Sequence, residues 1–593
     1  MSVRASQIGA ASALVLVLSV VLACGETRVR FLEPPTDFGR TEDAGSECDA
    51  RCSIDGRSVV NCRNEVVETC PLELSCGAGR CQPQCAAAAA DSSSNGCEFY
   101  FQSPLFSALN TDQSCYAAYI VNTATVPADI ELEFEGALLD TSKAVYEMDS
   151  ATTGLQLHSG PIAPGAGVIL FVSDDPKSKT SAGSGGHFPC PPGVEAAHYY
   201  NFNPKKSLVG SSFRLKATAP VSAATIFPFG GARSMMPAAT LLLPVSTWTK
   251  ENVLISAWES APLAPAGAQV VASEDATDVT IVPTKDIQSG DDLDGIPAGV
   301  PVTYRLDKGQ YLQLAQSEDL TGSFVTSTKP TSVFGVHACM NLPAHRGPCD
   351  MGNQQIPALE QWGSEYVGVG YRPRVGNESE RMPYRIMAAR DGTKLDYDPA
   401  VPLGAPLELR AGEMVTFSAR VGEAFVVRSQ DADHPIYLSA HMTSCLSDLH
   451  GETRDFGGLG DPEFVNVVPA GQYLTSASFF ADPTYADTSL VIVRAKTDGE
   501  FKDVTLACLG GPVPDFQPVG TRGEFEFTRV SISKRRMPGV KTADGKECTY
   551  GAHHLRSEGA FTATLWGIDN AASYAYPSGT ATRKLVSVPL VTK

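Results

Sequence analysis

One sequence element recurs along this chain of 593 residues at a nearly constant interval. It consists of a proline, an aromatic residue four or five positions later, and then a stretch in which apolar and polar residues alternate. The prolines are Pro244, Pro357 and Pro469, so the intervals are 357 − 244 = 113 and 469 − 357 = 112 residues. Propeller blades and solenoid repeats are shorter, whereas a β-sandwich domain needs about 100 residues. The interval therefore predicts a row of β-sandwich-like repeats.

Strand patterns recur in the same order within each repeat. Alternation of β-branched and polar residues is typical of strands with one buried face. The clearest stretches are 270–272, 277–281, 304–312, 384–388, 393–395, 490–493 and 502–506, with a weaker copy at 118–132. A further element, a strand, a short turn and a second strand with Pro220, Pro330 or Pro435, recurs at 210–221, 322–331 and 422–436, and a copy without the proline is expected at 555–561. The sequence predicts an all-β chain of about four tandem β-sandwich-like repeats, with boundaries 98–235, 236–348, 349–455 and 456–593. A β-propeller-like arrangement of half-repeats is the alternative.

The amino terminus is typical of an exported protein. Arg4 precedes a short apolar stretch, residues 8–23, which is too short for a membrane span and predicts a signal peptide over residues 1–23. Cys24 directly follows a small residue, an arrangement that resembles a bacterial lipobox. We therefore predict that Cys24 is lipidated, with plain secretion as the alternative. Gly25 stands where an aspartate would retain many lipoproteins at the inner membrane, so an outer-membrane or cell-surface location is expected.

A cysteine-rich segment follows the predicted lipid anchor. Residues 24–47 contain prolines and glycines without a regular period, which predicts a flexible tether. Residues 48–97 contain eight cysteines and few apolar residues, so cross-links rather than a hydrophobic core must hold them. We predict disulfide bonds because an exported chain is oxidised; some spacings suit zinc, but no histidine lies among these cysteines. Eight cysteines allow 105 pairings, so the connectivity stays open.

The cysteines of the repeats are predicted to staple loops. The three expected pairs are Cys339–Cys349, which bracket a short loop with proline and glycine, Cys508–Cys548 in the last repeat, and Cys115–Cys190 in the first. With Cys24 acylated, 16 − 1 = 15 cysteines remain, and an odd number leaves at least one unpaired in a monomer. Cys445 is our candidate for the unpaired thiol.

The charge balance argues against two classes of partner. The chain has 46 Lys and Arg against 66 Asp and Glu, a formal net charge of −20. Nucleic-acid backbones and anionic membrane surfaces repel such a chain. We therefore expect no nucleic-acid partner, and contact with a membrane only through the lipid anchor.

No stretch of the sequence has the pattern of a known catalytic site. A nucleophile elbow, an HExxH zinc helix and a phosphate-binding glycine loop are all missing from the sequence. The acidic pairs Glu131/Glu133 and Asp396/Asp398 have the alternation that a glycosidase uses, but 66 acidic residues produce such pairs by chance. We therefore expect no catalytic residue and no cofactor.

Three groups of side chains have metal-binding chemistry. His337 and His441, each close to a cysteine in the sequence, would suit zinc if they converged. Equivalent positions in different repeats are expected to lie one domain apart, so we favour packing or hydrogen-bonding roles. The acidic loop 291–295 offers oxygen ligands for Ca²⁺ but lacks the spacing of an EF-hand. The pair His553–His554 is expected to be exposed, and no metal site is predicted.

Several strings around the second and third repeats resemble one protein family. They are Gly322–Pro330, Val333–Asn341, Cys349–Asp350, Gln354–Pro357 and Trp362–Tyr366, with weaker support from Tyr200–Pro204 and Ser573–Pro577. Together they resemble the amino-terminal domain of IgGFc-binding proteins over residues 97–590 or so. The family takes its name from an animal mucus protein that binds antibody Fc. In exported bacterial lipoproteins this domain often follows a short cysteine-rich segment.

The resemblance implies an extracellular binding or adhesion module. Repeated sandwiches present many loops without a reaction centre, which suits binding rather than catalysis. We predict a non-catalytic cell-surface lipoprotein whose partner is an extracellular protein or glycan. A structural component of the envelope or matrix is the alternative, and a carbohydrate-active enzyme is the third candidate.

Overall fold

The computed structural model describes residues 50–587 apart from short gaps. The gaps are residues 54, 107–112, 150–153, 180–185, 202–205, 235, 261–263, 291–292, 345–347, 542–544 and 546. The predicted signal peptide, Cys24, the tether and Cys48 lie outside the described residues. So do the first two aspartates of the acidic loop 291–295.

The fold is all-β, as the alternating patterns predict. Within the described residues, the one α-helix is the short α1, Gln84–Ala90. No helix in this part of the chain is long and apolar enough to span a membrane.

A small disulfide-bonded module, residues 50–92, comes first. Its strands are β1 (Arg51–Cys52), β2 (Ser58–Val60), β3 (Val66–Thr69), β4 (Leu74–Gly77) and β5 (Arg80–Pro83), followed by α1. Disulfides join Cys52 to Cys76 and Cys70 to Cys81, and Cys62 is disulfide-bonded as well. A further disulfide, Cys85–Cys97, ties α1 to the first strand of the repeats.

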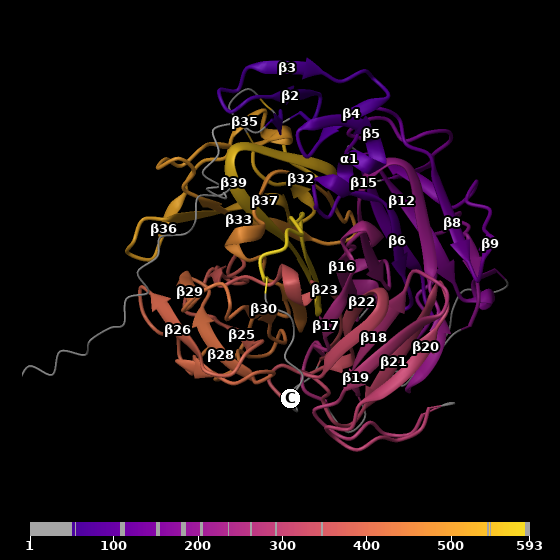
Figure 1. The fold of residues 1–593 in the computed structure, drawn as a ribbon, viewed down its shortest axis with the longest axis vertical. Helices are drawn as coiled ribbons and strands as arrows, with labels where there is room; N and C mark the ends of the chain where they lie inside the picture. The colour runs from indigo at the N-terminus through magenta and orange to yellow at the C-terminus, as the bar shows by residue number, and fades with distance from the viewer. Residues whose placement is uncertain are drawn as a thin grey trace, which may run out of the picture.

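Four β repeats follow the module (Figure 1). The first contains β6 (Gly96–Phe101), β7 (Tyr116–Asn122), β8 (Ile130–Phe134), β9 (Ala137–Leu138), β10 (Val145–Met148), β11 (Leu155–Leu157), β12 (Gly167–Asp174), β13 (His198–Tyr199), β15 (Phe213–Phe227) and β16 (Ala238–Leu241). The strand β14 (Leu208–Ser211) precedes β15 in the chain but pairs in the sheet of the second repeat. The second contains β17 (Thr249–Val253), β18 (Ala266–Ala272), β19 (Thr277–Val282), β20 (Val302–Leu306), β21 (Gln310–Gln316), β22 (Phe324–Met340) and β23 (Asp350–Ile356).

The third and fourth repeats have the same strand order. The third contains β24 (Glu365–Gly368), β25 (Arg381–Ala388), β26 (Thr393–Asp398), β27 (Glu408–Leu409), β28 (Met414–Arg420), β29 (Phe425–Ser429), β30 (Ile436–Met442) and β31 (Glu463–Asn466). The fourth contains β32 (Leu474–Ala481), β33 (Asp487–Ala495), β34 (Val504–Leu506), β35 (Gly511–Pro512), β36 (Gln517–Val519), β37 (Phe525–Lys534), β38 (Met537–Pro538), β39 (Gly551–Asp569) and β40 (Ala572–Pro577). Short 3₁₀ turns η3 (Val245–Thr247), η4 (Leu359–Gln361) and η5 (Ala470–Gln472) connect successive repeats.

Each repeat consists of two sheets, and in three repeats one long strand passes through both. In the second repeat, the first half of β22 pairs with β17 and β19, and its second half pairs with β18 and β23. The strands β15 and β39 do the same in the first and fourth repeats. In the third repeat the long strand is interrupted between β29 and β30, so its two sheets are separate.

The turns predicted at Pro220 and Pro330 lie inside continuous strands instead. Pro330 stands between the part of β22 that pairs with β19 and the part that pairs with β18, and Pro220 holds the equivalent place in β15. Proline donates no ladder hydrogen bond, and it is tolerated where a strand bends out of one sheet into the next. The pattern was thus interpreted as a turn although it marks the crossing between sheets.

The four repeats are arranged around one axis. The last strand of each repeat, β16, β23, β31 or β40, lies beside the corresponding strands of its neighbours, and these four inner strands surround the centre (Figure 1). Sheet pairing attaches β16, β23 and β31 to β15, β22 and β30 of the same repeat. The strand groups therefore end a few residues beyond the boundaries expected at 235, 348 and 455.

The hydrophobic cores lie at the seams between neighbouring repeats. One buried cluster joins Phe213 of the first repeat to Phe334 of the second, and others join the second to the third and the third to the fourth. A further cluster joins the fourth repeat to the first, where Tyr119 stacks on Phe480 with ring centroids 4.9 Å apart. Since every repeat shares a core with both neighbours, the four form a closed ring rather than a string of independent domains.

Polar side chains connect the inner strands at the axis. The buried amide of Gln354 on β23 donates to the carbonyls of Ala239 (2.7 Å) on β16 and Ala575 (3.0 Å) on β40. The amide of Asn466 on β31 donates to the carbonyl of Gln355 at 2.8 Å. Each bond satisfies a buried backbone carbonyl, so side chains take the place of a sheet ladder between the inner strands.

Residues from the two ends of the repeat region pair to close the ring. The backbone N–H of Ser94 donates to Thr580 at 2.8 Å, and that of Thr582 donates to Ser92 at 2.6 Å, with Ser93 opposite Ala581. Gln472 in the η5 turn exchanges hydrogen bonds with Arg583 in the same tail. The tail beyond β40 thus joins the first repeat to the turn between the third and fourth.

Candidate binding surface

The connections that precede the inner strands gather at one end of the axis, which we call the loop end. They are residues 228–237, 341–349, 443–462 and 570–571. The N–H of Ser444 donates to Leu342 at 2.7 Å, and that of Ala571 donates to Gly458 at 2.7 Å. These bonds make three of the four connections into one continuous surface.

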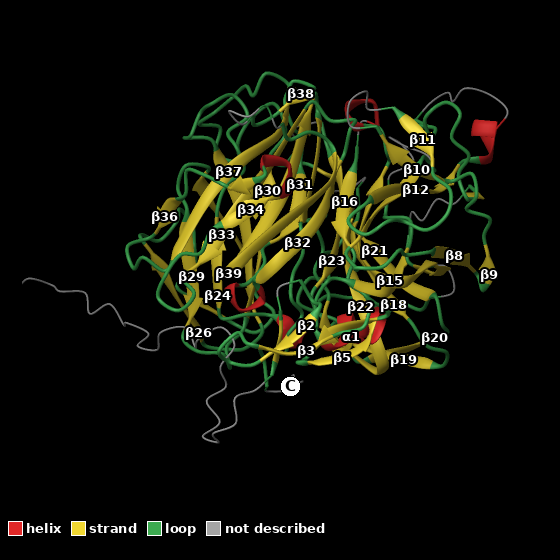
Figure 2. Ribbon diagram, turned by 90° about the horizontal axis from the view of Figure 1, so that it is seen from above, coloured by secondary structure: helices red, strands yellow, loops and turns green. Residues whose placement is uncertain are grey.

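The opposite end of the axis carries the η3, η4 and η5 turns and the cysteine-rich module. Gln361 of η4 donates to Thr247 of η3 at 2.7 Å, and Gln472 donates to Gln361 at 3.0 Å. Figure 2 shows module strands β2, β3 and β5 at this end, with the β38 hairpin at the other. The chain therefore enters the ring on the side away from the loop end.

The 443–462 connection is pinned by one buried arginine, Arg374. Its guanidinium donates to the carbonyls of Thr443 (2.8 Å), Ser444 (3.2 Å) and Leu459 (3.2 Å), which lie near both ends of the connection. The guanidinium also lies 3.5 Å from the ring centroid of Phe456. A long loop without regular structure keeps one conformation only when its backbone groups are satisfied, and Arg374 satisfies three of them.

The charge of Arg374 is neutralised by Glu380. Arg374 Nε lies 2.7 Å from Glu380 Oε1, and both side chains are completely buried. The hydroxyl of Tyr371 donates to the same carboxylate at 2.6 Å. A buried ion pair is tolerated when both partners are fully hydrogen-bonded, and these two are.

Disulfides brace other loops at this end. The structure joins Cys339 to Cys349 across the 341–348 connection, Cys115 to Cys190, and Cys508 to Cys548. Cys115 lies beside the 228–237 connection, since its carbonyl accepts from the N–H of Phe229 at 2.9 Å. The structure thus brings together the three cysteine pairs expected from the sequence. Each disulfide reduces the number of conformations that its loop can adopt. Cys445 is buried and has no disulfide partner among the described residues.

Apolar side chains are exposed on these braced loops. Val375 is 47% exposed and Leu446 is 49% exposed, on loops that Arg374 holds together. Met537, 63% exposed, belongs to the β38 hairpin, which Arg536 attaches to Asp569 at 2.6 Å. Exposed aliphatic groups on a braced loop can contact a partner without a large loss of conformational entropy.

Three buried carboxyl groups lie beneath the loop end. They belong to Asp350 at the start of β23, Asp461 just before β31, and Glu463 on β31. Burial raises the pKa of Asp350 and Glu463 well above their usual values and that of Asp461 to about 8. No pattern in the sequence indicated this group, because its members come from two repeats.

The acidic residues considered for catalysis form hydrogen bonds and ion pairs with neighbouring side chains. Asp398 accepts hydrogen bonds from the N–H and the hydroxyl of Thr521, the latter at 2.7 Å. Asp396 is paired with Arg522. Glu133 is paired with Arg214 at 2.8 Å and with Lys216 at 2.7 Å. Carboxylates held by such partners are poor general acids.

His337 and His441 face one seam between the second and third repeats. His337 Nε2 is 3.0 Å from the carbonyl oxygen of Glu259, and burial lowers the pKa of His337 to about 4. His441 stacks against Phe464, and the charge of Arg385 acts on both imidazoles. They are therefore closer than one domain apart, but their contacts are those of packing and hydrogen bonding. The described residues contain no group of three or more His, Cys, Asp or Glu side chains arranged to hold a metal ion.

The pair His553–His554 is less exposed than expected. His553 is buried and stacks on Phe479, with ring centroids 5.2 Å apart. His554 bonds the hydroxyl of Ser478 and the carbonyl of Gly165. Both lie on β39.

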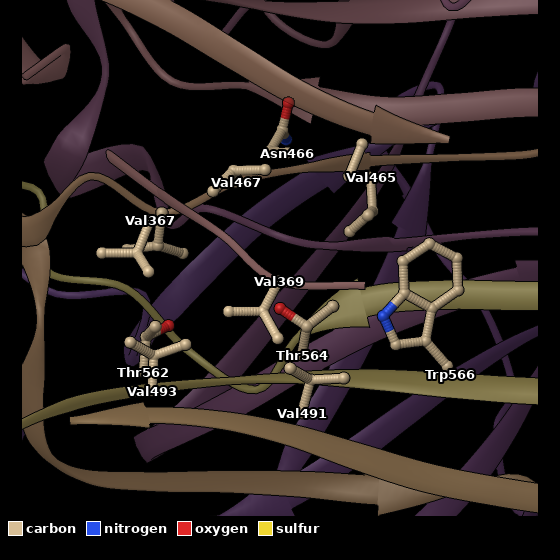
Figure 3. A pocket seen from close by; sticks show the side chains of 12 residues that line it. Val367, Val369, Val465, Asn466, Val467, Val491, Val493, Thr562, Thr564 and Trp566 are labelled. Atoms are coloured by element: carbon tan, nitrogen blue, oxygen red, sulfur yellow. The ribbon is translucent and has the colours of Figure 1, made fainter. Parts of the chain in front are cut away.

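The best-formed cavities of the described residues are too small for a substrate. One of about 30 Å³ lies between the third and fourth repeats, where Val369, Val491, Thr564 and Trp566 converge (Figure 3). Another of about 20 Å³ lies near the axis, beside Pro357 and Pro469. Each has room for about one water molecule, whereas sites for small molecules measure about 300 Å³ or more.

Two comparisons with known proteins give the same result. The profile of the family described as "IgGFc binding protein" matches residues 238–567, more than half of the chain. The IgGFc-binding protein of Homo sapiens is 25% identical over 257 residues, which cover 42% of this chain and 4% of the human protein. The chain thus aligns with only a small part of that relative's length. The family match includes Arg374 and the 341–349 and 443–462 connections.

Proposed function

The chain belongs to the IgGFc binding protein family, and from this premise we propose that it is a non-catalytic extracellular binding protein whose ligand contacts the loop end. The observation that carries this proposal is the concentration of braced loops at one end of a closed ring. Arg374 holds loops that expose Val375 and Leu446, and the three disulfides brace further loops. Rigid loops with exposed apolar groups form contact surfaces with a low entropy cost on binding.

The ligand class we propose is an extracellular protein. A surface without a deep cavity suits a macromolecule, because protein interfaces are formed by extended and mostly flat contact areas. The human relative is named for binding IgG Fc, which makes the Fc fragment the first ligand to test on this chain. A glycan partner would instead be expected to occupy a groove lined with aromatic side chains.

We further propose attachment to the cell surface through a lipid on Cys24. The module lies at the end of the ring away from the loops, so a chain that rises from the membrane through residues 24–47 would present the loop end outward. Several acyl chains give stable attachment where one is marginal. This orientation supports a role in adhesion at the outer membrane.

The binding test uses the full chain with Cys24→Ala, so that no lipid complicates the measurement. Immobilised IgG Fc is titrated with this protein and with a Val375→Asp/Leu446→Asp variant that places charges on the loop end. The matched control is Val66→Asp/Val67→Asp, because these valines are 62% and 64% exposed but lie on β3 of the module, at the other end of the axis. We expect the first variant to bind at least about tenfold more weakly, and the control to bind as the parent does.

Two results would contradict the proposal. Equal weakening by both variants would show that the loop end is not the contact surface. Failure to bind Fc or any member of a panel of secreted host proteins, with recovery of the chain only in complex with itself, would favour a structural envelope role.

A further inference from the structure

The three buried carboxyl groups lie where the 443–462 connection meets the ring. Asp461 ends this connection, and Glu463 begins β31 two residues later. The hydroxyl of Ser573 on β40 donates to the carbonyl of Asp461 at 2.6 Å, and the N–H of Ser573 donates to Asp350 Oδ2 at 3.4 Å. Glu463 Oε2 accepts from the N–H of Ala575 at 3.1 Å. The carboxyls of the second and third repeats thus meet β40 of the fourth at one point.

Two of these carboxyl groups lack the donors that ionised carboxylates require. Neither side-chain oxygen of Asp461 accepts a hydrogen bond, and Oδ1 of Asp350 has no partner among the described residues. Glu463 differs, because its Oε1 also accepts from the N–H of Phe464 at 2.7 Å. All three side chains are completely buried. An ionised carboxylate without donors in such a place is strongly unfavourable, so the geometry favours the neutral form of Asp350 and Asp461.

The surroundings supply little compensating positive charge. Arg374 acts on Asp461, but its guanidinium is already paired with Glu380. The thiol of Cys445 and the carboxyls themselves act on Asp350, and both of these effects oppose ionisation. The phenol of Tyr485 also interacts electrostatically with Asp350, Glu463 and Asp482. Ionising one carboxyl therefore makes ionisation of the next more difficult.

We propose that Asp350, Asp461 and Glu463 form a proton-dependent latch for the 443–462 connection, which is held in place while the three carboxyls are neutral and is released when they ionise. The latch acts on a main loop of the loop end. It concerns the conformation of the connection itself, so it does not depend on whether this surface binds a ligand.

The direction of the pH effect follows from proton binding. Burial raises the pKa of all three groups, and that of Asp461 to about 8, whereas the unfolded chain has ordinary carboxyl pKa values near 4. The closed state therefore binds more protons than the open state. Its stability is complete below about pH 4 and declines as the pH rises toward the raised values, so the connection opens on the alkaline side.

Hydrogen exchange of the full chain measures this opening directly. Amide protection of residues 443–462 is determined by mass spectrometry across a pH series, after correction for the intrinsic pH dependence of exchange. We expect protection to fall at least about tenfold between about pH 5.5 and about pH 8.5, since each pH unit between the open-state pKa and the raised closed-state pKa of a linked group changes the population of the open state by up to tenfold. Peptides from the module serve as an internal reference and should keep constant protection.

Variants separate the latch from other pH effects. Asp350→Asn/Asp461→Asn keeps both groups neutral at every pH and should retain the protection of the connection up to about pH 8.5. The matched control is Asp455→Asn, which removes an exposed carboxylate on the same connection that accepts from Gly457 at 2.7 Å. This control should lose protection as the parent does. If the double variant does not fold, the single Asp461→Asn variant should show a smaller pH-dependent loss than the parent.

Two outcomes would overturn the proposal. One is equal protection of residues 443–462 in the parent chain throughout the pH series. The other is a pH-dependent loss in the Asn variants as large as that in the parent.

Discussion

Replacing Arg374 by methionine should free the 443–462 connection while the rest of the ring stays folded. The change removes the guanidinium from three backbone carbonyls and leaves the completely buried Glu380 without its counter-charge. Breaking a buried ion pair by removing one partner costs about 3–5 kcal/mol. Because three of the lost bonds hold this connection, we expect the cost to appear as local opening there. At about 1.4 kcal/mol per tenfold change, the open fraction should rise about a hundredfold or more.

Native-state proteolysis measures the open fraction. Trypsin cleavage after Arg454, an exposed residue of the connection, is followed by mass spectrometry under conditions in which the ring remains folded. The control Arg420→Met removes a surface arginine that reaches Glu452 of the same connection at 3.9 Å. This exposed pair should contribute less than about 1 kcal/mol, so cleavage should rise less than about fivefold.

A double variant tests the physical reason for the effect. In Arg374→Met/Glu380→Gln no charge is left buried, so cleavage should be at least about tenfold slower than in Arg374→Met alone. Two results would show that Arg374 does not hold the 443–462 connection in place. One is a rise in cleavage of less than about threefold in Arg374→Met, and the other is equally fast cleavage of the double and the single variant.

Three further predictions concern the ring and its attachment. Ending the chain after Ser578 removes the tail that bonds residues 92–94, Gln472 and Glu360, and it should cost at least about 3 kcal/mol in urea unfolding. Gln354→Met leaves the carbonyls of Ala239 and Ala575 without a donor and should lower the free energy of unfolding by about 2–3 kcal/mol. The control Gln156→Met, on the exposed β11, should change the free energy of unfolding by less than about 0.5 kcal/mol. Cys24→Ala should move the protein from the membrane pellet into the soluble fraction, and an unchanged pellet would rule out the lipid anchor.

The repeat could be predicted from the sequence because the turn between successive repeats requires particular residues at fixed positions. Proline starts each turn, and the indole N–H of Trp248 or Trp362 donates back to the carbonyl of Leu243 or Pro357 at 3.0 Å. The alternating strands of each sheet were equally readable, since one face of each is buried. These two signals predict the all-β class and the interval between repeats.

The closed ring could not be read in the same way. The inner strands carry a different polar residue at the axis in each repeat, for example Gln354 in the second and Glu463 in the third. The hydrophobic cores lie between repeats, and alternation within one strand does not say which repeat covers it. The arrangement around an axis therefore depends on contacts that a period along the chain does not encode.

Of the features of the loop end, only the cysteine pairs could be predicted from the sequence. Cys339 and Cys349 bracket a short connection, so their approach follows from the spacing. Arg374 bonds backbone carbonyls that lie 69 to 85 residues away, and a carbonyl has no signature in the sequence. The buried carboxyls were hidden in the same way, because Asp350 and Asp461 are far apart in the chain and acidic residues usually indicate exposed positions.

Closure of the ring is tested most directly by a disulfide between its two ends. Ser93 and Ala581 lie opposite each other in an antiparallel bridge whose flanking residues carry the hydrogen bonds, which is the geometry in which opposed side chains come closest. The Ser93→Cys/Ala581→Cys variant should form this disulfide within one chain upon mild oxidation, as shown by peptide mapping of the monomer. Four independent tandem domains would keep the two positions apart. Free thiols at both positions, or cross-links only between chains, would contradict the closed ring.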